Sequence, residues 1–324
     1  MSYPGYKSIH GRELGLTPRG LKARGRYLVP AIDQGGNTYY VNSAASNASN
    51  NNDGRSVDYP LATLDGAIGK CTANQGDRIV LLANHAETIA GASGITADIA
   101  GISVIGLGTY NQRPRFLMDG GTSVSFVVSA ADFSIENCVF ASGHSGVVLC
   151  FDVTAVGATF IDVEFVNNTT NENFLTPIKA TGTTDNEANG LKIVGCRWLT
   201  TDADDLEFVE INANLDGLVF QHNYINTAGT ACAGILCAGT KVLSGALITH
   251  NFVQSAATSG DLFIDNGGST GQTGFVAYNL IGNLDTSGAQ VLGVATGLQF
   301  FENYMTSTST ESGGLQLTAD TPNS

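Results

Sequence analysis

Five acids stand within a short stretch of the chain: Asp202, Asp204, Asp205, Glu207 and Glu210. Two of them, with Asp204 and Asp205 as the candidate pair, could act as the acid and the base of a glycosidic cleavage. Several together could instead bind Ca²⁺ through hard oxygen ligands. A chain with 29 acids also contains such runs by composition alone. We therefore expect a solvated acidic loop here.

Two histidines form a second group, because each precedes an Asn and an aromatic residue. His222 begins His-Asn-Tyr-Ile and His250 begins His-Asn-Phe-Val, while Tyr278 and Glu302 stand at the same position in two later segments. This column could contact another subunit, bind a glycan or be plain surface. A metal site would need more ligands that converge on one point, so we expect no metal.

A third group is basic and lies at the N-terminus. Residues 1–26 contain one acid, Glu13, and six basic residues: Lys7, Arg12, Arg19, Lys22, Arg24 and Arg26. Five glycines and the lack of an apolar period predict an arm that builds no core of its own. We expect either a disordered cationic tail or an extended arm that orders on an acidic protein partner, with nucleic acid as a weaker alternative.

The rest of the chain is acidic but has enough apolar residues for a core. It holds 9 basic and 28 acidic residues, and the whole chain is 43% hydrophobic and only 14% charged. Such an acidic body argues against nucleic acid as its partner. We expect no membrane span, since no uninterrupted apolar run of about 18 residues occurs. No signal peptide is readable at the N-terminus.

The six cysteines form no CxxC pair and match no zinc framework. We expect them to be reduced, buried and apolar in role. No P-loop and no dinucleotide-binding fingerprint is present, so we expect no cofactor.

The elements that must position these groups begin near residue 37. Asn37–Asn42 is a short β-rich run, and 60–70 predicts one short helix with an apolar face of Leu61, Leu64 and Ile68. Pro60 suits the first turn of that helix. Arg78–Leu82 predicts a buried strand.

From about residue 100 the sequence repeats loosely, with a period of roughly 25–30 residues. Seven strand-length segments share two columns of side chains that are two residues apart, so both columns face the same way. The later column is Phe140, Phe165, Trp198, Ile225, Val253, Ile281 and Met305, and the earlier one is Cys138, Val163, Cys196, Asn223, Asn251, Asn279 and Asn303. We expect both columns to face inward, with the four Asn amides hydrogen-bonded along a ladder. The histidine column alternates with them and should face outward, with rings about 5 Å apart.

The repeat cannot be helical, because its segments are as short as strands, are bounded by Gly and are rich in β-branched and aromatic residues. We predict an all-β chain that winds as a parallel β-helix of some eight or nine coils, each with Gly or Asn at its corners. The helix near 60–70 should cap the first coil, because an open end exposes core and unpaired backbone.

A resemblance to a known superfamily rests on the entry segment of this repeat. Thr38–Asn42, Asn52-Asp-Gly54, Pro60–Leu64 with Ala67-Ile68, and Gly76–Val80 resemble the entry of pectin-lyase-like right-handed parallel β-helix proteins. With the coils, the resemblance covers roughly residues 38–306. That superfamily contains polysaccharide lyases, glycoside hydrolases, phage tailspikes and other virion proteins. The short arm on a compact β-helix resembles phage virion structural proteins most closely, which implies trimers, attachment through the N-terminus and a place on the particle surface.

The enzymes of the superfamily need residues that this chain supplies only in part. Ser142-Gly-His144 resembles the His-Gly motif of polygalacturonases, but their Asn-Thr-Asp and Arg-Ile-Lys runs are missing, and Asp204-Asp205 follows the His instead of preceding it. We therefore expect His144 to be a turn residue. A pectate-lyase interpretation needs an arginine base beside Ca²⁺ ligands, yet Arg113 and Arg115 should lie some three coils from the acidic run.

The sequence therefore predicts a single-stranded right-handed parallel β-helix over 38–306, a basic arm over 1–37 and a tail over 307–324. The function we expect is that of a non-enzymatic phage virion protein, made in the host cytoplasm and placed on the particle surface as a homotrimer. Its arm would bind the major capsid or tail protein, and capsid decoration is favoured over a tailspike because residues 307–324 are too short for a receptor domain. The alternative is a tailspike or secreted protein that binds or cleaves a surface polysaccharide, as a lyase or glycoside hydrolase.

Overall fold

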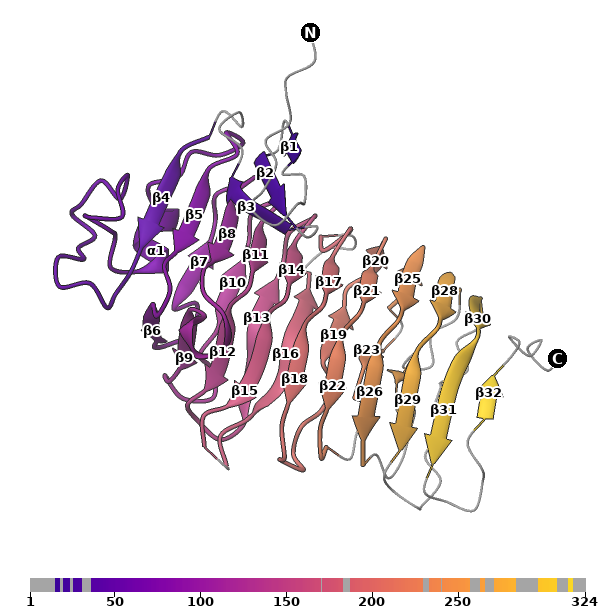
Figure 1. Ribbon diagram of the computed structural model, residues 1–324. Helices are drawn as coiled ribbons and strands as arrows, with labels where there is room; N and C mark the ends of the chain where they lie inside the picture. The colour runs from indigo at the N-terminus through magenta and orange to yellow at the C-terminus, as the bar shows by residue number, and fades with distance from the viewer. Residues whose placement is uncertain are drawn as a thin grey trace, which may run out of the picture.

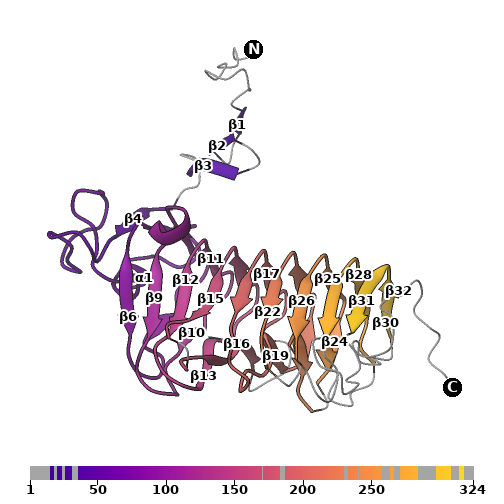
Figure 2. The ribbon, with the colours of Figure 1, turned by 60° about the horizontal axis from the view of Figure 1, so that its bottom comes forward.

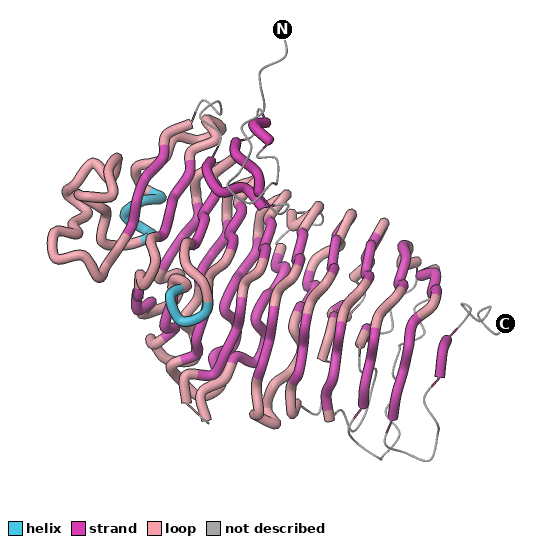
Figure 3. The backbone as a smooth tube through the Cα atoms, viewed as in Figure 1, coloured by secondary structure: helices cyan, strands magenta, loops and turns pink. Residues whose placement is uncertain are grey.

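The computed structural model shows a solenoid whose coils follow one another from the N-terminal to the C-terminal end (Figure 1). It describes residues 36–169, 171–182, 187–229, 233–239, 241–256, 263–265, 271–283 and 297–304, and the backbone alone of 305–307, 314–316 and three short strands within 15–30. Nearly every element in the described part is a strand (Figure 3).

Three parallel sheets run the length of the solenoid, and successive strands of the chain pass from one sheet to the next. Sheet 1 contains β4 (Thr38–Val41), β5 (Arg78–Leu81), β8 (Ser103–Gly106), β11 (Ser134–Glu136), β14 (Thr159–Ile161), β17 (Lys192–Val194), β21 (Val219–Gln221), β25 (Ala246–Thr249), β28 (Gly274–Ala277) and β30 (Leu298–Phe301). Sheet 2 contains β6 (Ala86–Ile89), β9 (Arg115–Met118), β12 (Val139–Ser142), β15 (Glu164–Asn167), β18 (Arg197–Leu199), β22 (Tyr224–Asn226), β26 (Phe252–Ser255), β29 (Leu280–Asn283), β31 (Asn303–Ser307) and the antiparallel β32 (Gly314–Gln316). Sheet 3 contains β7 (Ile95–Ala97), β10 (Phe126–Val128), β13 (Val147–Val153), β16 (Phe174–Thr181), β19 (Val209–Asn212), β23 (Ile235–Cys237) and β27 (Ile264–Asp265).

The chain is therefore the predicted right-handed parallel β-helix, since parallel crossovers take that hand almost without exception. Seven coils have a strand in all three sheets among the described residues, and β28–β29 and β30–β31 add two more with strands in two sheets. A further pair, β20 (Leu215–Asp216) and β24 (Leu243–Ser244), links two neighbouring coils.

Both columns predicted to face inward are buried wherever the structure describes their side chains, and the strand register aligns the later column from coil to coil. Phe140 pairs with Phe165, Phe165 with Trp198, and the column continues through Ile225, Val253 and Ile281 to Met305. The rings of Phe116 and Phe140 stack with centroids 4.9 Å apart. Full burial of each such side chain contributes roughly 1.5–3 kcal/mol, so this column is a main source of stability.

The asparagine ladder is also present and is fully hydrogen-bonded. The side-chain Nδ2 of Asn223, Asn251 and Asn279 donates to Oδ1 of the next Asn at 3.0, 2.9 and 2.9 Å, ending at Asn303. Each Oδ1 also accepts the backbone N–H of the residue one coil earlier, and each Nδ2 also donates to a carbonyl of the preceding coil in sheet 1. All four side chains are buried. Complete pairing is what allows amides to stand inside an apolar core.

The residue before each of these inward positions forms the corner between sheet 1 and sheet 2. Seven corners have a left-handed backbone, with φ between 46° and 68°: Asn137, Asp162, Gly195, His222, His250, Tyr278 and Glu302. A left-handed residue costs roughly 1–2 kcal/mol when it is not glycine. The turn sends the corner side chain outward and the next one inward, which is why the two columns separate.

The single α-helix among the described residues, α1 (Leu64–Ile68), is shorter than the helix predicted over 60–70. Thr63 caps it, since its Oγ1 accepts the backbone N–H of Gly66 at 3.1 Å, and Leu61 pairs with Val41 in a β-bridge instead of joining the helix. Pro60 therefore lies outside the first turn. The helix packs against β4, β5 and β7 and buries Leu64, Ala67 and Ile68 at the N-terminal end of the core, as expected of a cap.

Part of the N-terminal arm forms a small antiparallel sheet that was not predicted from the sequence. Its strands are β1 (Gly15–Thr17), β2 (Gly20–Ala23) and β3 (Arg26–Pro30). Figure 2 shows this sheet set apart from the solenoid. Lys22 and Arg26 lie on its strands, whereas the other basic residues of the arm lie outside the described residues: Lys7, Arg12, Arg19 and Arg24.

Five cysteines are buried and unpaired, as expected: Cys71, Cys138, Cys150, Cys196 and Cys237. The sixth, Cys232, lies outside the described residues. Burial raises the pKa of the Cys196 thiol to about 12, so this group stays protonated and inert. Within the described part of the chain, no helix has the length and hydropathy to cross a bilayer.

Replacing Asn251 by Ala should destabilise the solenoid strongly. The substitution removes two hydrogen bonds that Asn251 Oδ1 accepts from the backbone N–H and Nδ2 of Asn223, and two that Asn251 Nδ2 donates to the Phe220 carbonyl and Asn279 Oδ1. Each buried group left unpaired costs about 1–3 kcal/mol. Chemical denaturation should show a loss of at least about 3 kcal/mol. The exposed Gln299→Ala is the matched control, and an equal loss in both variants would show that the ladder contributes nothing.

Candidate functional site

The five acids of 202–210 do not form one solvated loop, so that expectation was wrong for two of them. Asp204 is exposed and Asp202 is half-buried, and Glu210 pairs with the Lys179 ammonium at 2.7 Å. Asp205 and Glu207 are buried as the chain turns inward before β19. Asp204 and Asp205 therefore lie on opposite sides of the coil surface and do not face one common site.

The two buried acids belong to a polar cluster that joins neighbouring coils. Asp205 accepts hydrogen bonds from Asn173 Nδ2 at 3.1 Å and Thr227 Oγ1 at 2.7 Å, while Glu207 accepts one from Thr176 Oγ1 at 2.7 Å. Burial raises the pKa of Asp205 to about 6 and that of Glu207 to about 7. Enclosed carboxyls with these partners stabilise the coil stack and are closed to a substrate.

His144 lies exposed in the turn between β12 and β13, in agreement with the turn residue predicted from the sequence. Its Nδ1 is 2.9 Å from the Ser145 carbonyl oxygen. No group of three His, Cys, Asp or Glu side chains in the described part of the chain could hold a metal ion.

The histidine column faces outward with the predicted spacing. The rings of His222 and His250 stack with centroids 5.0 Å apart, and Tyr278 continues the stack 5.1 Å from His250. Glu302 follows at the next corner and is exposed like the others.

This column is the middle of a larger apolar surface on the last four coils. Seven hydrophobic side chains there are between 37% and 53% exposed, and we call them the C-terminal stripe: Tyr224, Leu247, Phe275, Tyr278, Leu280, Phe301 and Tyr304. Leu247 is in register with Phe275 on sheet 1, and Leu280 is in register with Tyr304 on sheet 2. The stripe is thus continuous from coil to coil across the corner of the two sheets.

The same columns are mostly polar in the earlier coils. On sheet 1 the column of Leu247 and Phe275 begins with Thr38, Arg78, Ser103, Ser134, Thr159 and Lys192. On sheet 2 the column of Leu280 and Tyr304 begins with Ala86, Arg115, Val139, Glu164 and Arg197. Within these two columns, the large exposed hydrophobic side chains therefore lie in the last four coils.

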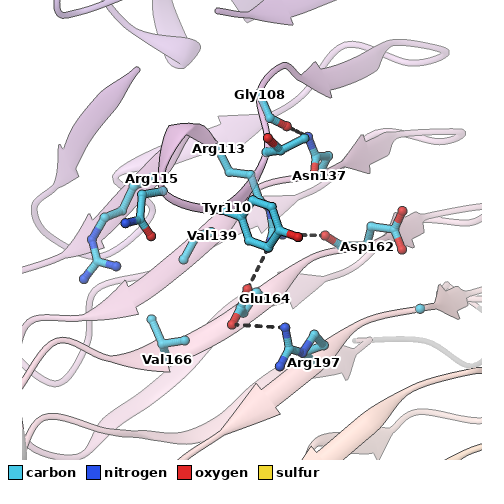
Figure 4. A pocket seen from close by; sticks show the side chains of 13 residues that line it. Gly108, Tyr110, Arg113, Arg115, Asn137, Val139, Asp162, Glu164, Val166 and Arg197 are labelled. Carbon is cyan, nitrogen blue, oxygen red and sulfur yellow. Dashed lines mark hydrogen bonds and ion pairs between the residues drawn. The ribbon is translucent and has the colours of Figure 1, made fainter. Parts of the chain in front are cut away.

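A cleft of about 750 Å³ lies over sheet 2 in the earlier coils. Its floor is formed by Val139, Glu164, Val166 and Arg197, and residues 108–111, which include part of the 3₁₀ turn η1 (Tyr110–Gln112), overhang it. Figure 4 shows Tyr110 at the centre of the cleft, with Arg115 and Arg197 on opposite sides of it.

Arg113 fastens the overhanging loop to the next two coils. Its guanidinium donates to Glu164 Oε2 at 2.6 Å, to the Asp162 carbonyl at 2.7 Å and to the Cys138 carbonyl at 2.9 Å. Glu164 also lies 3.9 Å from the Arg197 guanidinium, so it stands between two cations. The loop is held from the other side by Asn137, whose Nδ2 donates to the Gly106 and Gly108 carbonyls.

This cleft was not found from the sequence. Arg113 and Arg115 were expected some three coils from the acidic run, and the structure confirms that separation, since Arg115 is three strands from Arg197 in sheet 2. The sequence did contain a signal that could have located the cleft. Val139, Glu164 and Arg197 each stand two residues after a corner residue of the repeat, so they share one column, which Arg115 extends to the preceding coil.

Comparison with known proteins adds little to this geometry. No protein-family model matches the sequence, and no curated protein does either. One solved structure, a rhamnogalacturonan lyase, aligns with a TM-score of 0.37 and 12% identity, over 81% of this chain and 84% of that chain. Similarity at this level says nothing of activity, so the function has to be inferred from the residues of this chain.

The buried acids predict how stability depends on pH. Because their pKa values rise on folding from 3.8 to about 6 and from 4.5 to about 7, the folded state binds more protons than the unfolded state between these values. Their contribution is complete below about pH 4 and is lost as the pH rises through about 6 and 7. The melting temperature should therefore fall by several degrees between about pH 5 and pH 8 because of these two groups.

The double variant Asp205→Asn, Glu207→Gln should lose that part of the decrease, and the exposed Asp204→Asn should keep it. Calorimetry at a series of pH values measures the difference between each variant and the wild type. Identical slopes in the double variant and the wild type would contradict the assignment.

Proposed function

We propose that this chain is a non-enzymatic structural protein of a bacteriophage particle, and that it stands on the particle surface as a trimer of parallel β-helices. The C-terminal stripe is the observation that carries this proposal. Contiguous exposed hydrophobic surface is uncommon on a monomer and marks a contact with a partner.

A second copy of the same chain fits the stripe better than an unrelated partner. The body beyond residue 26 holds 28 acids against 9 basic residues, so two copies repel one another over most of their surfaces. The stripe and its histidine column contain one acid, Glu302. Copies that meet along this strip bury rings without burying like charges. A strip that runs along the solenoid also lets parallel copies meet over several coils around a common axis.

The proposed attachment to the particle uses the basic arm. Its six basic residues and single acid contrast with the acidic body, and the backbone of residues 15–30 forms a small sheet of its own. An arm of this charge is attracted to an acidic protein surface, for which we propose the major capsid protein, with capsid decoration as the role. The resemblance to virion proteins supports the same placement.

Self-association is tested by light scattering coupled to size exclusion. The wild type should have three times the chain mass of 33.6 kDa, and the double variant Phe275→Glu, Leu280→Glu should be a monomer with an unchanged circular dichroism spectrum, because its added charges would face one another in each contact. Val148→Glu places a charge at a side chain that is 48% exposed on sheet 3 and is the control. A monomeric wild type, or a variant that stays trimeric, would refute the stripe as the interface.

Removal of residues 1–30 should abolish attachment while the melting temperature stays within about a degree of the wild type. The measurement is co-sedimentation of the purified protein with particles of the phage that lack it. A variant with Lys22, Arg24 and Arg26 changed to Glu should also fail to sediment, and full attachment of the truncated chain would show that the anchor lies elsewhere.

A further inference from the structure

The C-terminal stripe consists of two apolar flanks that meet at the corner between sheet 1 and sheet 2. Each flank contributes three side chains, and Tyr278 stands on the corner itself. The flanks are Leu247, Phe275 and Phe301 on sheet 1, and Tyr224, Leu280 and Tyr304 on sheet 2. The rings of Phe275 and Phe301 have centroids 5.9 Å apart, and Tyr224 stacks on Phe252 at 4.7 Å. Each solenoid therefore presents two different apolar faces on either side of one edge.

Two different faces on one subunit suit a closed ring of copies. A two-fold dimer uses one self-complementary patch, whereas each subunit of a cyclic trimer contacts its two neighbours through two different patches. In a ring of parallel solenoids, the sheet 1 flank of one copy packs on the sheet 2 flank of the next, and the corner between the flanks points toward the common axis. His222 and His250 stand on that corner and are exposed. Three copies of each imidazole then surround the axis, in two layers that follow the 5.0 Å spacing of the stack.

The two stacked histidines have no carboxylate beside them on the column of corners. Gly195 is the corner before the pair, and Tyr278 is the corner after it. The nearest acids on the column are Asp162 and Glu302, each two corners from the nearer histidine. Glu164 on sheet 2 is also two coils before the first histidine. A positive charge on one imidazole therefore faces the other imidazole before it meets a carboxylate.

The sheets on either side of the pair add positive charge. On sheet 2, the guanidinium carbon of Arg197 lies 5.8 Å from the centroid of the Tyr224 ring, in the coil of the first histidine. On sheet 1, Lys192 is exposed on β17, one coil before the pair. Gln221 and Thr249, which directly precede the two histidines, are uncharged and hydrogen-bonded to each other at 2.9 Å. The surroundings of the pair thus tolerate neutral imidazoles and oppose charged ones.

Resting on the trimer proposed above, we propose that the histidine column lies on the trimer axis and makes assembly depend on pH, so that neutral imidazoles allow the ring to close and acid opens it. Imidazole is the side chain whose charge changes between about pH 5 and pH 8. Protonation of both layers places up to six cations around one axis, between apolar flanks where like charges repel more strongly than in water. Ordinary surface carboxylates keep their charge over this range, so the repulsion between the acidic bodies changes little.

Sedimentation velocity of dilution series at about pH 7.5 and about pH 5.5 tests the proposal. A histidine with an ordinary pKa of about 6.5 is mostly protonated in the single chain at the lower pH, and each one that must become neutral in the trimer weakens assembly about tenfold. The half-assembly concentration of the wild type should therefore rise at least about tenfold in acid. Acid does not unfold the chain over this range, because the buried Asp205 and Glu207 stabilise the fold toward lower pH. Circular dichroism at both pH values checks this.

The double variant His222→Asn, His250→Asn removes the titrating groups and should lose the pH response. Asn suits both corners, because Asn137 has the same left-handed backbone at an equivalent corner. Whatever the affinity of this variant, its half-assembly concentrations at the two pH values should be nearly equal. His144→Asn is the matched control, since His144 is exposed in a turn outside the stripe, and it should keep the full response.

The position of the corner on the axis is tested separately by cross-linking. In Tyr278→Cys, a short bismaleimide should join the thiols of neighbouring copies, and a denaturing gel should show linked dimers. Val148→Cys puts a thiol at an exposed position on sheet 3 and should give few linked dimers. The wild type gives the background from the cysteines of the chain.

The possible failures can be told apart. A wild type that is monomeric at both pH values refutes the trimer and the pH switch together. A wild-type trimer with the same half-assembly concentration at both pH values refutes the switch alone, as does a full pH response in the double histidine variant. Equal cross-linking of Tyr278→Cys and Val148→Cys refutes the position of the column on the axis.

Discussion

Hydrogen bonding between the backbones of successive coils is the constraint on which every other feature of this protein depends. It fixes the spacing of neighbouring strands at about 4.8 Å and puts each residue directly over its counterpart in the previous coil. The neighbours of each side chain are therefore the side chains at the equivalent positions of the coils before and after it. The phenylalanine column, the asparagine ladder and the stacked histidines are all results of that one register, inside and outside the coil.

Because the register transmits residue type along the axis, the surface divides into zones with different properties. Earlier coils place charged residues over sheet 2, where the arginine cleft forms, and the last coils place aromatic residues in the same column. The two zones meet within sheet 2, where the guanidinium carbon of Arg197 lies 5.8 Å from the centroid of the Tyr224 ring. In this solenoid the chemical character of the surface thus changes with the position of the coil along the axis.

The sequence alone was sufficient to predict the features that recur in every coil. Equivalent positions, their inward or outward direction and the spacing of the histidine rings all follow from a period of two within strands and a constant coil. It was insufficient where the chain departs from that pattern. Asp205 and Glu207 are turned inward by the path into β19, and Leu61 pairs with Val41 before the helix can begin. The cleft also needs the irregular loop of residues 108–113, which brings Arg113 against Glu164, although strand register alone aligns Arg115, Glu164 and Arg197.

The asparagine ladder also has a kinetic meaning. Each amide receives its partners from the coils before and after it, so no coil in this region is complete until its neighbour is in place. Folding in this region must then spread between neighbouring coils. A partly folded chain exposes an unpaired asparagine amide and an unpaired strand edge at the last folded coil. The strand edge that recruits the next coil is also the edge through which incomplete chains would aggregate.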